Sequence, residues 1–350
     1  PEKSITNDAR KVAVVGSGPA GMTVADRLAR KGHRVTVFER LPVIAGMLSV
    51  GIPAYRLPRQ VIDREYRRIE SLGVKIQLNT AIGPDGAHTL DDLFKMGNDA
   101  VCLAVGAHKS LSLSIPGETL RGVIQGIELL KTINLSQRLD AAANRAALKH
   151  LLPSGTKTRA VVLGGGNTAM DVARTLKRVG VEDVCIAYRR TRAEMPALEE
   201  EIDDTEQEAI AIEYLTAPGR IIGDSENNVT GLECIRMKLG EPDESGRRRP
   251  VPISGSEFAI PAELVVLAIG QVPDIKSLDP DDRITMTRDQ RIQVNRVTFA
   301  TNRPGVFATG DAVTRDKMSA IEAIGMGKKA AAEIDAYLSG KATRADAAGA

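Results

Sequence analysis

The sequence predicts an α/β fold made of two Rossmann-like dinucleotide-binding domains, one of them inserted into the other. Three observations carry this prediction. A glycine-rich turn lies between a strand pattern and a helix pattern at residues 12–28, and a second turn of the same kind lies at residues 160–176. Short apolar runs also alternate with amphipathic segments along the chain, which is typical of open, mostly parallel sheets.

Composition sets the class of protein. The chain has 350 residues, enough for about two domains, with 43% hydrophobic and 26% charged residues and a net charge of +2. Aromatic residues make up 3%, with no Trp, and no basic cluster stands out, so nucleic acid is not an expected partner. The apolar runs are too short to span a bilayer, and no secretory leader pattern opens the sequence. We therefore expect a cytoplasmic protein.

The three cysteines, Cys102, Cys185 and Cys234, lie far apart in strand-like apolar runs. Buried cytosolic thiols are the expected reading, because a redox disulfide or an Fe–S cluster needs clustered thiols. The four histidines are scattered as well, so no metal site is predicted.

The first half of the chain is expected to alternate strands and helices up to a crossover. Residues 11–40 read as strand, turn, helix and strand, and residues 42–60 read as a loop rich in Gly and Pro. A helix is predicted over 60–73, followed by strands over 74–79 and 99–107. A turn cluster at 114–122 is the expected passage into the inserted domain.

The second half repeats the pattern. A helical region is predicted over 124–152, and residues 160–190 repeat the opening strand, turn, helix and strand. An acidic helix, several strands and an exposed hairpin tip follow, and then a buried strand, a short strand and a last helix. Their residues are 198–209 for the acidic helix, 241–250 for the tip, 264–270 and 305–310 for the strands, and 318–338 for the last helix. The predicted domains are 1–122 with 272–350, and 123–271.

The first turn has the complete dinucleotide-binding fingerprint. Gly16, Gly18 and Gly21 follow a strand and open a helix, and Glu39 closes the next strand. One glycine makes the tight turn, the next admits the pyrophosphate to the backbone, and the third lets the helix pack on the strand. The helix N-terminus stabilises the phosphate charge, and Glu39 is expected to bind the ribose hydroxyls.

An overlay of the sequence on itself with an offset of 148 residues relates the two turns. Gly16 falls on Gly164, Gly18 on Gly166 and Gly21 on Ala169. Glu39 falls on Ala187 in this overlay. The second turn is therefore an internal repeat of a binding domain that lacks the acid.

The residues after the second strand indicate the coenzyme of the repeat. An acid there would repel a ribose 2′-phosphate, whereas arginines bind it through forked hydrogen bonds. Arg189, Arg190 and Arg192 follow Ala187. We therefore expect NADP(H) at the second turn, with a solvated strand end as the alternative role for these arginines.

Two dinucleotide domains in one chain indicate electron transfer between a resident FAD and an exchangeable nicotinamide. The segment "GVFATGDAV" supports this, because Gly310 and Asp311 follow a strand, where the acid could bind the ribityl chain. The helix that starts near Ser319 would aim its positive end at the flavin.

At this point the chain resembles a known family. Segments such as "VAVVGSGPAG", "VVLGGGNTAMD", "YRRTRAEMPA", "LAIGQVPD" and "GVFATGDAV" are similar to those of the glutamate synthase small-subunit family of two-dinucleotide-fold flavoproteins, in the same order over about residues 11–338. The N-terminal Fe–S domain of that family is not part of this sequence. Other departures are Ala45-Gly46, where the family often has two glycines, and Ser49-Val50, where members outside glutamate synthase often have Arg-Tyr.

The resemblance implies sites for both cofactors and no catalytic side chain, because the flavin carries the chemistry. The first and last parts of the chain would form the FAD-binding domain, and residues 123–271 would form the NAD(P)-binding domain. The candidate FAD ligands are Gly16, Gly18, Pro19, Ala20, Gly21, Glu39, Arg40, Gly46, Met47, Gly106, Gly310, Asp311, Ser319 and Ala320. The candidate NAD(P) ligands are Gly164, Gly166, Asn167, Thr168, Arg189, Arg190 and Gly270.

The expected function is that of a flavin subunit that passes electrons between NAD(P)(H) and an Fe–S partner. The partner could be a glutamate synthase large subunit, a ferredoxin, or a metal-dependent aldehyde or formate oxidoreductase. A thioredoxin-reductase activity is not expected, because the chain has no cysteine pair. A stand-alone flavin reductase acting on a small molecule and a non-catalytic binding module are the alternatives.

Overall fold

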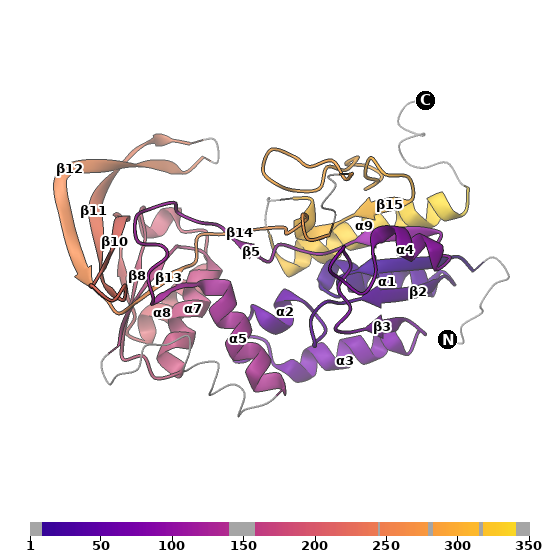
Figure 1. Ribbon diagram of the computed structural model, residues 1–350, viewed down its shortest axis with the longest axis horizontal. Helices are drawn as coiled ribbons and strands as arrows, with labels where there is room; N and C mark the ends of the chain where they lie inside the picture. The colour runs from indigo at the N-terminus through magenta and orange to yellow at the C-terminus, as the bar shows by residue number, and fades with distance from the viewer. Residues whose placement is uncertain (1–8, 140–157, 244–245, 279–282, 315–317, 341–350) are drawn as a thin grey trace. The chain divides into compact units, whose positions relative to one another are not determined.

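The computed structural model describes residues 9–139, 158–243, 246–278, 283–314 and 318–340 (Figure 1). By internal packing the chain divides into two compact units. Unit 1 comprises residues 1–49, 54–109 and 271–350, and unit 2 comprises residues 50–53 and 110–270. The change of unit therefore falls after Lys109, within the region that precedes the crossover turn predicted at 114–122.

Unit 1 contains a five-stranded parallel sheet in the order β15-β4-β1-β2-β3. Its helices cover the sheet, and α9 packs along α1 (Figure 1). The strands are β1 (Lys11–Val15), β2 (Arg34–Phe38), β3 (Lys75–Gln77), β4 (Ala100–Leu103) and β15 (Val306–Ala308). The helices are α1 (Pro19–Arg30), α2 (Met47–Val50), α3 (Arg59–Glu70), α4 (Leu90–Lys95) and α9 (Ala320–Leu338), with a 3₁₀ turn at Gly310–Ala312.

Unit 2 contains a second five-stranded parallel sheet, in the order β6-β13-β7-β8-β9. Its strands are β6 (Val123–Gln125), β7 (Arg159–Leu163), β8 (Asp183–Ala187), β9 (Ala211–Glu213) and β13 (Leu264–Leu267). The helices are α5 (Gly126–Leu139), α7 (Asn167–Arg178) and α8 (Glu199–Gln207), with a 3₁₀ turn at Arg192–Glu194. The two-residue strands β5 (Lys109–Ser110) and β14 (Gln271–Val272) lie at the points where the chain changes unit.

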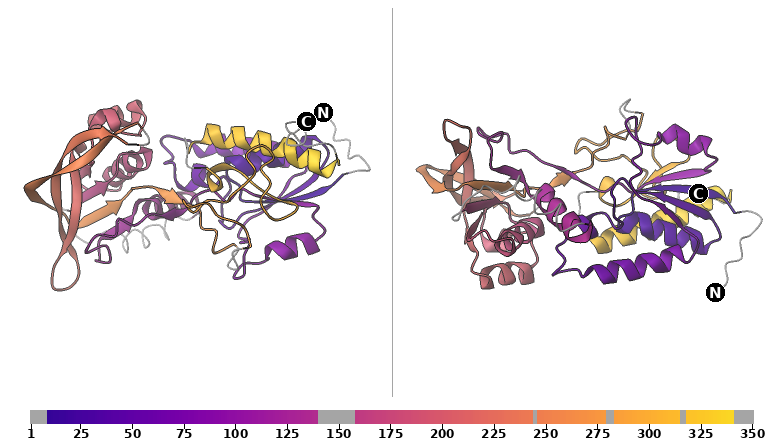
Figure 2. Two further views of the ribbon diagram at one scale, coloured as in Figure 1. Left: turned by 90° about the horizontal axis from the view of Figure 1, so that it is seen from above. Right: turned by 60° about the horizontal axis from the view of Figure 1, so that its bottom comes forward.

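Unit 2 also carries a three-stranded antiparallel sheet of β10 (Thr216–Gly223), β11 (Val229–Pro242) and β12 (Arg248–Pro261). Figure 2 shows β11 and β12 as a long, curved pair at the edge of this unit. Their connection is the hairpin tip predicted at 241–250. Of the helical region predicted over 124–152, α5 covers the first part, and the rest lies outside the described residues.

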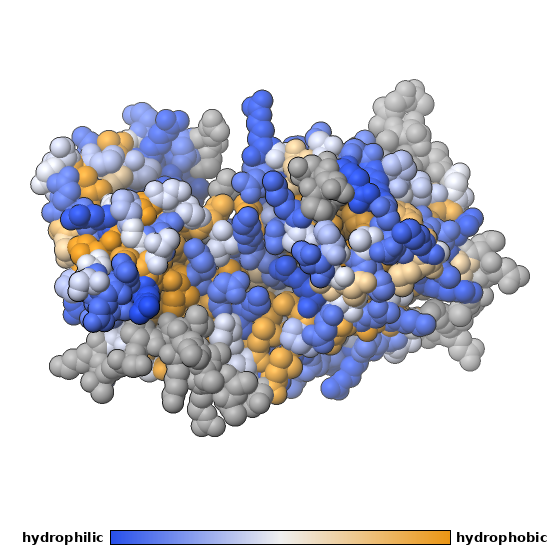
Figure 3. Space-filling view, in the orientation of Figure 1, coloured by the Kyte–Doolittle hydropathy of each residue, from blue (hydrophilic) through white to orange (hydrophobic). Residues whose placement is uncertain are grey.

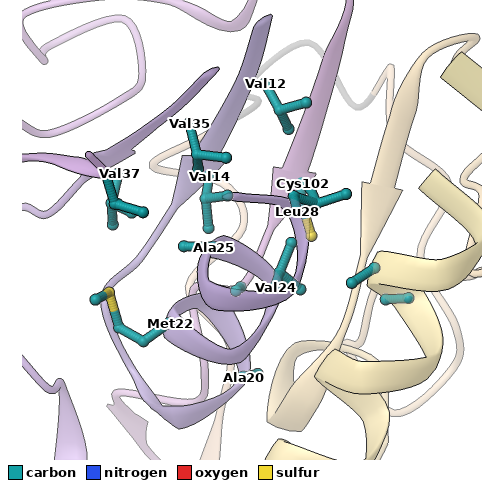
Figure 4. Close-up of a cluster of buried hydrophobic side chains, with 14 of the residues drawn as sticks. Val12, Val14, Ala20, Met22, Val24, Ala25, Leu28, Val35, Val37 and Cys102 are labelled. Atoms are coloured by element: carbon teal, nitrogen blue, oxygen red, sulfur yellow. The ribbon is translucent and has the colours of Figure 1, made fainter. Parts of the chain in front are cut away.

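Both faces of each parallel sheet are buried, which explains the continuous apolar runs in the sequence. In β1, Val12 and Val14 point into the cluster under α1 and α9, shown in Figure 4. Ala13 and Val15 point into a cluster on the other face. β7 divides its side chains between two clusters in the same way.

One face of the described surface can be seen in the space-filling view of Figure 3. Hydrophilic and hydrophobic residues are interspersed on the face shown in Figure 3. Among the described residues, no helix is both long and apolar enough to cross a membrane.

Candidate dinucleotide-binding sites

The glycines of the first turn differ in what surrounds them. Gly16 has φ +103°, and a Cβ there would lie 2.4 Å from the carbonyl oxygen of Ala104. A Cβ on Gly21 would lie 2.1 Å from the carbonyl oxygen of Gly16. Internal packing therefore requires both of these glycines.

Gly18 is different, because no described atom lies within 4 Å of a Cβ built there. Its φ of −63° and ψ of 177° are open to any residue, and it precedes α1 without a described side-chain cap. Pro19 occupies the first turn of the helix, where a missing N–H costs nothing. The fold itself gives no reason for a glycine at this position, whereas the close approach of a phosphate to an uncapped helix N-terminus does.

Glu39 lies at the end of β2 and is 4% exposed. Its carboxylate accepts hydrogen bonds from the Ser17 amide at 2.9 Å, the Ser17 hydroxyl at 2.6 Å and the Leu41 amide at 2.9 Å. The Tyr66 hydroxyl donates to the Ser17 carbonyl at 2.5 Å. A carboxylate has about four acceptor positions, so Glu39 is fixed against the turn and keeps acceptor capacity for one more donor.

The loop after Glu39 returns to the turn. A Cβ on Gly46, which has φ +50°, would lie 3.2 Å from the Cα of Gly18, so the two glycines are neighbours. Met47 begins α2 and is half-buried, Arg40 is exposed, and Gly106 has φ +66° beyond the end of β4. The structure thus brings Gly46 to the turn, and it places Gly106 two residues after Ala104, which the turn contacts.

The C-terminal segment of unit 1 meets the same helix. A Cβ on Gly310, with φ +72°, would lie 2.8 Å from the Cβ of Ala20, and one on Gly327 would lie 2.6 Å from the Ala20 carbonyl oxygen. Ser319 caps α9, accepting a hydrogen bond from the Glu322 amide at 3.2 Å, and Ala320 is the first helical residue. The first turn and the residues around Gly310 therefore form one neighbourhood.

Asp311 is half-buried in this neighbourhood. Burial raises the pKa of its carboxyl group, and the charge of Arg291 opposes the increase. No described donor hydrogen-bonds to the side chain. A ligand hydroxyl would supply the donor that this desolvated carboxylate lacks.

Arg291 is a residue that sequence reasoning missed. It is 2% exposed, and its guanidinium donates to the Asp311 carbonyl and, at 3.3 Å, to the Gln271 carbonyl. In the sequence it reads as one more charge in a polar stretch. Only its burial reveals that it supports the Asp311 turn.

The second turn reproduces the first in unit 2. Gly164 has φ +147°, and a Cβ there would lie 2.3 Å from the Ala268 carbonyl oxygen, as Gly16 does with Ala104. Ala169 takes the place of Gly21. At Gly166 a Cβ would meet only the side chain of Pro196 at 3.9 Å, an ordinary contact, and no described side chain caps α7.

The other residues predicted for this site lie at or near the turn. Asn167 opens α7, and its side-chain oxygen accepts a hydrogen bond from the Leu198 amide at 2.9 Å. Thr168 follows and is half-buried. Gly270 is exposed beyond β13, the strand that pairs with β7.

The strand registers correct the sequence overlay. Three residues separate α1 from β2, but four separate α7 from β8, so the offset of 148 residues ends before the second strand. Val15 pairs with Phe38, and Leu163 pairs with Ala187. The residue that takes the place of Glu39 is therefore Tyr188 and not Ala187.

Tyr188 also takes over the contact of Glu39 with the turn. Its ring fills the space beside Gly165, where a Cβ would lie 2.4 Å away, and its hydroxyl donates to the Glu194 carbonyl at 2.7 Å. Gly165 corresponds to Ser17. The absence of an acid at this point, which the overlay predicted, holds in the corrected alignment.

The three arginines after Tyr188 have different surroundings. Arg189 is exposed. Arg190 is 4% exposed and donates to Asp243 Oδ2 at 2.6 Å and to the Arg248 carbonyl at 2.7 Å. Arg192 forms ion pairs with Asp203 and with Glu206.

Each unit contains a parallel sheet and a glycine turn whose second glycine precedes a helix without a described side-chain cap, which is the architecture of a dinucleotide-binding domain. The chain belongs to the pyridine nucleotide-disulphide oxidoreductase family, whose sequence profile matches residues 10–327, and within it to the glutamate synthase small-chain family. The predicted fold class and family are confirmed. This membership also confirms an FAD-dependent oxidoreductase of a pyridine nucleotide.

Two relatives and one solved structure illustrate the match. The NADP(+)-dependent formate dehydrogenase subunit beta of Moorella thermoacetica is 44% identical over 96% of this chain and 45% of its own length. The glutamate synthase [NADPH] small chain of Escherichia coli is 35% identical over 94% of this chain and 69% of its own length. FprA of Mycobacterium tuberculosis matches in fold, with a TM-score of 0.79 at 20% identity over 95% of this chain and 85% of that one. The chain spans about half the length of several relatives.

Proposed function

We propose that this chain is the flavin module of a larger redox complex, in which it passes electrons between NADP(H) and an Fe–S partner. The observation that carries the proposal is the pair of glycine turns. At Gly18 and Gly166 a side chain would fit the fold, so a bound dinucleotide explains why neither position has one. The turns differ at the ribose position, where one has Glu39 and the other Tyr188.

In unit 1 the proposed role of the chain is to hold FAD permanently. Gly18, the α1 N-terminus and Gly46 would receive the pyrophosphate, Glu39 the ribose and Asp311 the ribityl chain. The remaining candidates, Pro19, Ala20, Arg40, Met47, Gly106, Gly310, Ser319 and Ala320, stay predictions. When bound, the flavin takes two electrons together as a hydride and releases them singly, which links a nicotinamide to one-electron carriers.

In unit 2 the proposed role is to bind the coenzyme reversibly. Gly166 and the amides that open α7 would receive the pyrophosphate, while Asn167 and Thr168 form the rim of the turn. The protein's task is orientation, so no acid or base is required of a side chain. NADP(H) is favoured over NAD(H), because a neutral Tyr188 and the exposed Arg189 replace the acid that would repel a 2′-phosphate.

The names of the relatives support the coenzyme and the subunit role. Those of the formate dehydrogenase and glutamate synthase subunits specify NADP(+) and NADPH, and both are parts of larger enzymes. The Fe–S nature of the partner and a cytoplasmic location remain parts of the proposal.

The experiment is an anaerobic titration of the FAD-loaded protein with NADPH and, separately, with NADH, while flavin absorbance is followed. We expect NADPH to bleach the flavin at a lower concentration than NADH, and an Fe–S acceptor to restore the absorbance. A protein that binds no FAD, or a flavin that neither coenzyme reduces, would contradict the proposal. Rapid reoxidation by a small molecule without any protein acceptor would instead support a stand-alone reductase.

A further inference from the structure

The β11–β12 hairpin reaches back to the end of β8, where the coenzyme ribose is expected. Arg190 makes the connection through Asp243 on one side of the hairpin and the Arg248 carbonyl on the other. The hairpin end is closed by hydrogen bonds from the Asp243 amide to the Arg247 carbonyl at 2.7 Å and from the Gly246 amide to the Asp243 carbonyl at 2.8 Å. The backbone of Arg190 is also bonded to the segment before β10, since the Leu215 amide donates to the Arg190 carbonyl at 3.0 Å.

These contacts bring two arginines from distant parts of the sequence together. The Arg190 side chain donates a hydrogen bond to the Arg248 carbonyl. Arg189 directly precedes Arg190, and Arg247 directly precedes Arg248, so this hydrogen bond brings the two preceding arginines near each other. Their charges interact: partial desolvation of the guanidinium by neighbouring atoms, although the residue as a whole is exposed, and then the charges of Arg190 and Arg247 lower the pKa of Arg189, while the charge of Asp243 opposes the decrease. Three arginines and one carboxylate, Asp243, therefore leave an excess of positive charge at this point, which favours the binding of a doubly charged phosphate.

We propose that Arg189 and Arg247 together bind the 2′-phosphate of the coenzyme, and that Arg190 is a positioning residue that holds the hairpin in place for them. Arg190 is 4% exposed, and two of its five N–H donors are used by Asp243 and Arg248. Arg189 is exposed and Arg247 is half-buried, so both are accessible to a ligand. The hairpin thus becomes a specificity element.

This inference rests on the proposed coenzyme site, but it is tested by binding rather than by turnover. The probes are 2′,5′-ADP and 5′-ADP, which differ only by the phosphate in question, and the measurement is calorimetric affinity for the FAD-loaded protein. We expect R189A and R247A each to weaken 2′,5′-ADP about 10- to 100-fold, the usual loss for a charge-assisted hydrogen bond, and to leave 5′-ADP within about twofold.

The matched control is R220A. Arg220 is an exposed arginine of the same antiparallel sheet and pairs with Glu233. The amide of Thr216, at the start of β10, donates to the Tyr188 carbonyl at 3.0 Å, and Arg220 lies four residues further along β10, about 13 Å away at the rise of a strand. R220A should change neither affinity. If R247A binds 2′,5′-ADP as the unchanged protein does, or loses both probes equally, the inference is wrong.

The positioning role has its own variants, R190K and D243N. Both should weaken 2′,5′-ADP selectively, with R190K the milder because it retains the ion pair with Asp243. If both variants lose affinity equally for 2′,5′-ADP and 5′-ADP, the role of Arg190 and Asp243 is merely structural. These outcomes are independent of flavin reduction: failure of NADPH to reduce the flavin would contradict the proposed function, while a selective effect of R247A would still support the phosphate site.

Discussion

At the scale of single residues, the proposed ligand role of Asp311 and the stability of the fold oppose each other. Its carboxylate is half-buried beside the Gly310 turn, and burial raises its pKa. A carboxyl group with a raised pKa in the folded state binds its proton more tightly there than in the unfolded state. The folded protein therefore loses stability as the pH rises from the pKa of the unfolded state through that of the folded state. The charge is therefore a cost to the ligand-free protein.

The replacement D311N should reverse this cost. We expect the ligand-free variant to be more stable than the unchanged protein at neutral pH, with the difference disappearing as the pH falls towards 3.8, the ordinary value for Asp. FAD affinity should fall about tenfold or more with the loss of a charge-assisted hydrogen bond. Urea unfolding of both proteins between pH 4 and 7 gives the stability difference, and flavin fluorescence gives the affinity. Equal or lower stability of the variant at pH 7 would contradict this account of Asp311.

A residue could be predicted from the sequence when its role depends on residues close to it in the chain. Gly16, Gly18 and Gly21 could be assigned because turn, phosphate approach and helix packing all lie within six residues. The contact of Arg291 with Asp311 and the proposed role of Arg247 could not, because each involves a segment far away in the chain. Arg190 was predicted as a phosphate ligand, and its burial against the β11–β12 hairpin was not visible in the sequence.

At the scale of elements, the strand–turn–helix unit contains glycines that the fold requires and glycines that it does not require. Gly16 and Gly164 combine a positive φ with a backbone atom at 2.4 and 2.3 Å from a built Cβ. Gly18 and Gly166 have ordinary backbone angles and room for a methyl group. One sequence motif therefore contains glycines in two different structural situations.

We predict that G16A destabilises the ligand-free protein by about 2–4 kcal/mol, since it combines backbone strain with a collision. G18A should change the free energy of unfolding by no more than about 0.5 kcal/mol. Chemical denaturation of FAD-free protein measures both. A large destabilisation by G18A would show that the turn at Gly18 has a structural requirement of its own.

Elements were predictable where periodicity is strong, and connections between them were not. The helices α1, α3, α8 and α9 and the buried strands lie where the sequence predicted them. The overlay of the repeats went wrong at the α7–β8 connection, where one added residue is invisible without the strand register. Neither the six-residue helix α4 nor the length of β11 and β12 was predicted, since a short helix and strands paired with register shifts have weak sequence patterns.

At the scale of the whole molecule, one architecture occurs twice in the chain. The series β4-β1-β2-β3 and β13-β7-β8-β9 are equivalent, with β1 and β7 central in their sheets, whereas the outer strand β15 is the last strand of its sheet along the chain and β6 is the first of its own. In each sheet the first glycine of the turn lies against the carbonyl oxygen just beyond the neighbouring strand, Ala104 in one and Ala268 in the other. The described parts of the units differ at the ribose position and in the β11–β12 hairpin of unit 2, and from these differences we infer that the units bind different nucleotides.

The measurement that tests this assignment most directly is the nucleotide content of the paired variants G18A and G166A. Both changes add a methyl group that the fold can accommodate but that would collide with a bound phosphate. G18A should lose FAD and still bind 2′,5′-ADP in calorimetry, whereas G166A should keep FAD and bind 2′,5′-ADP at least tenfold more weakly, an estimate based on the cost of about one lost charged hydrogen bond. If both variants keep both ligands, or if each change affects both ligands alike, the two turns do not serve two separate nucleotides.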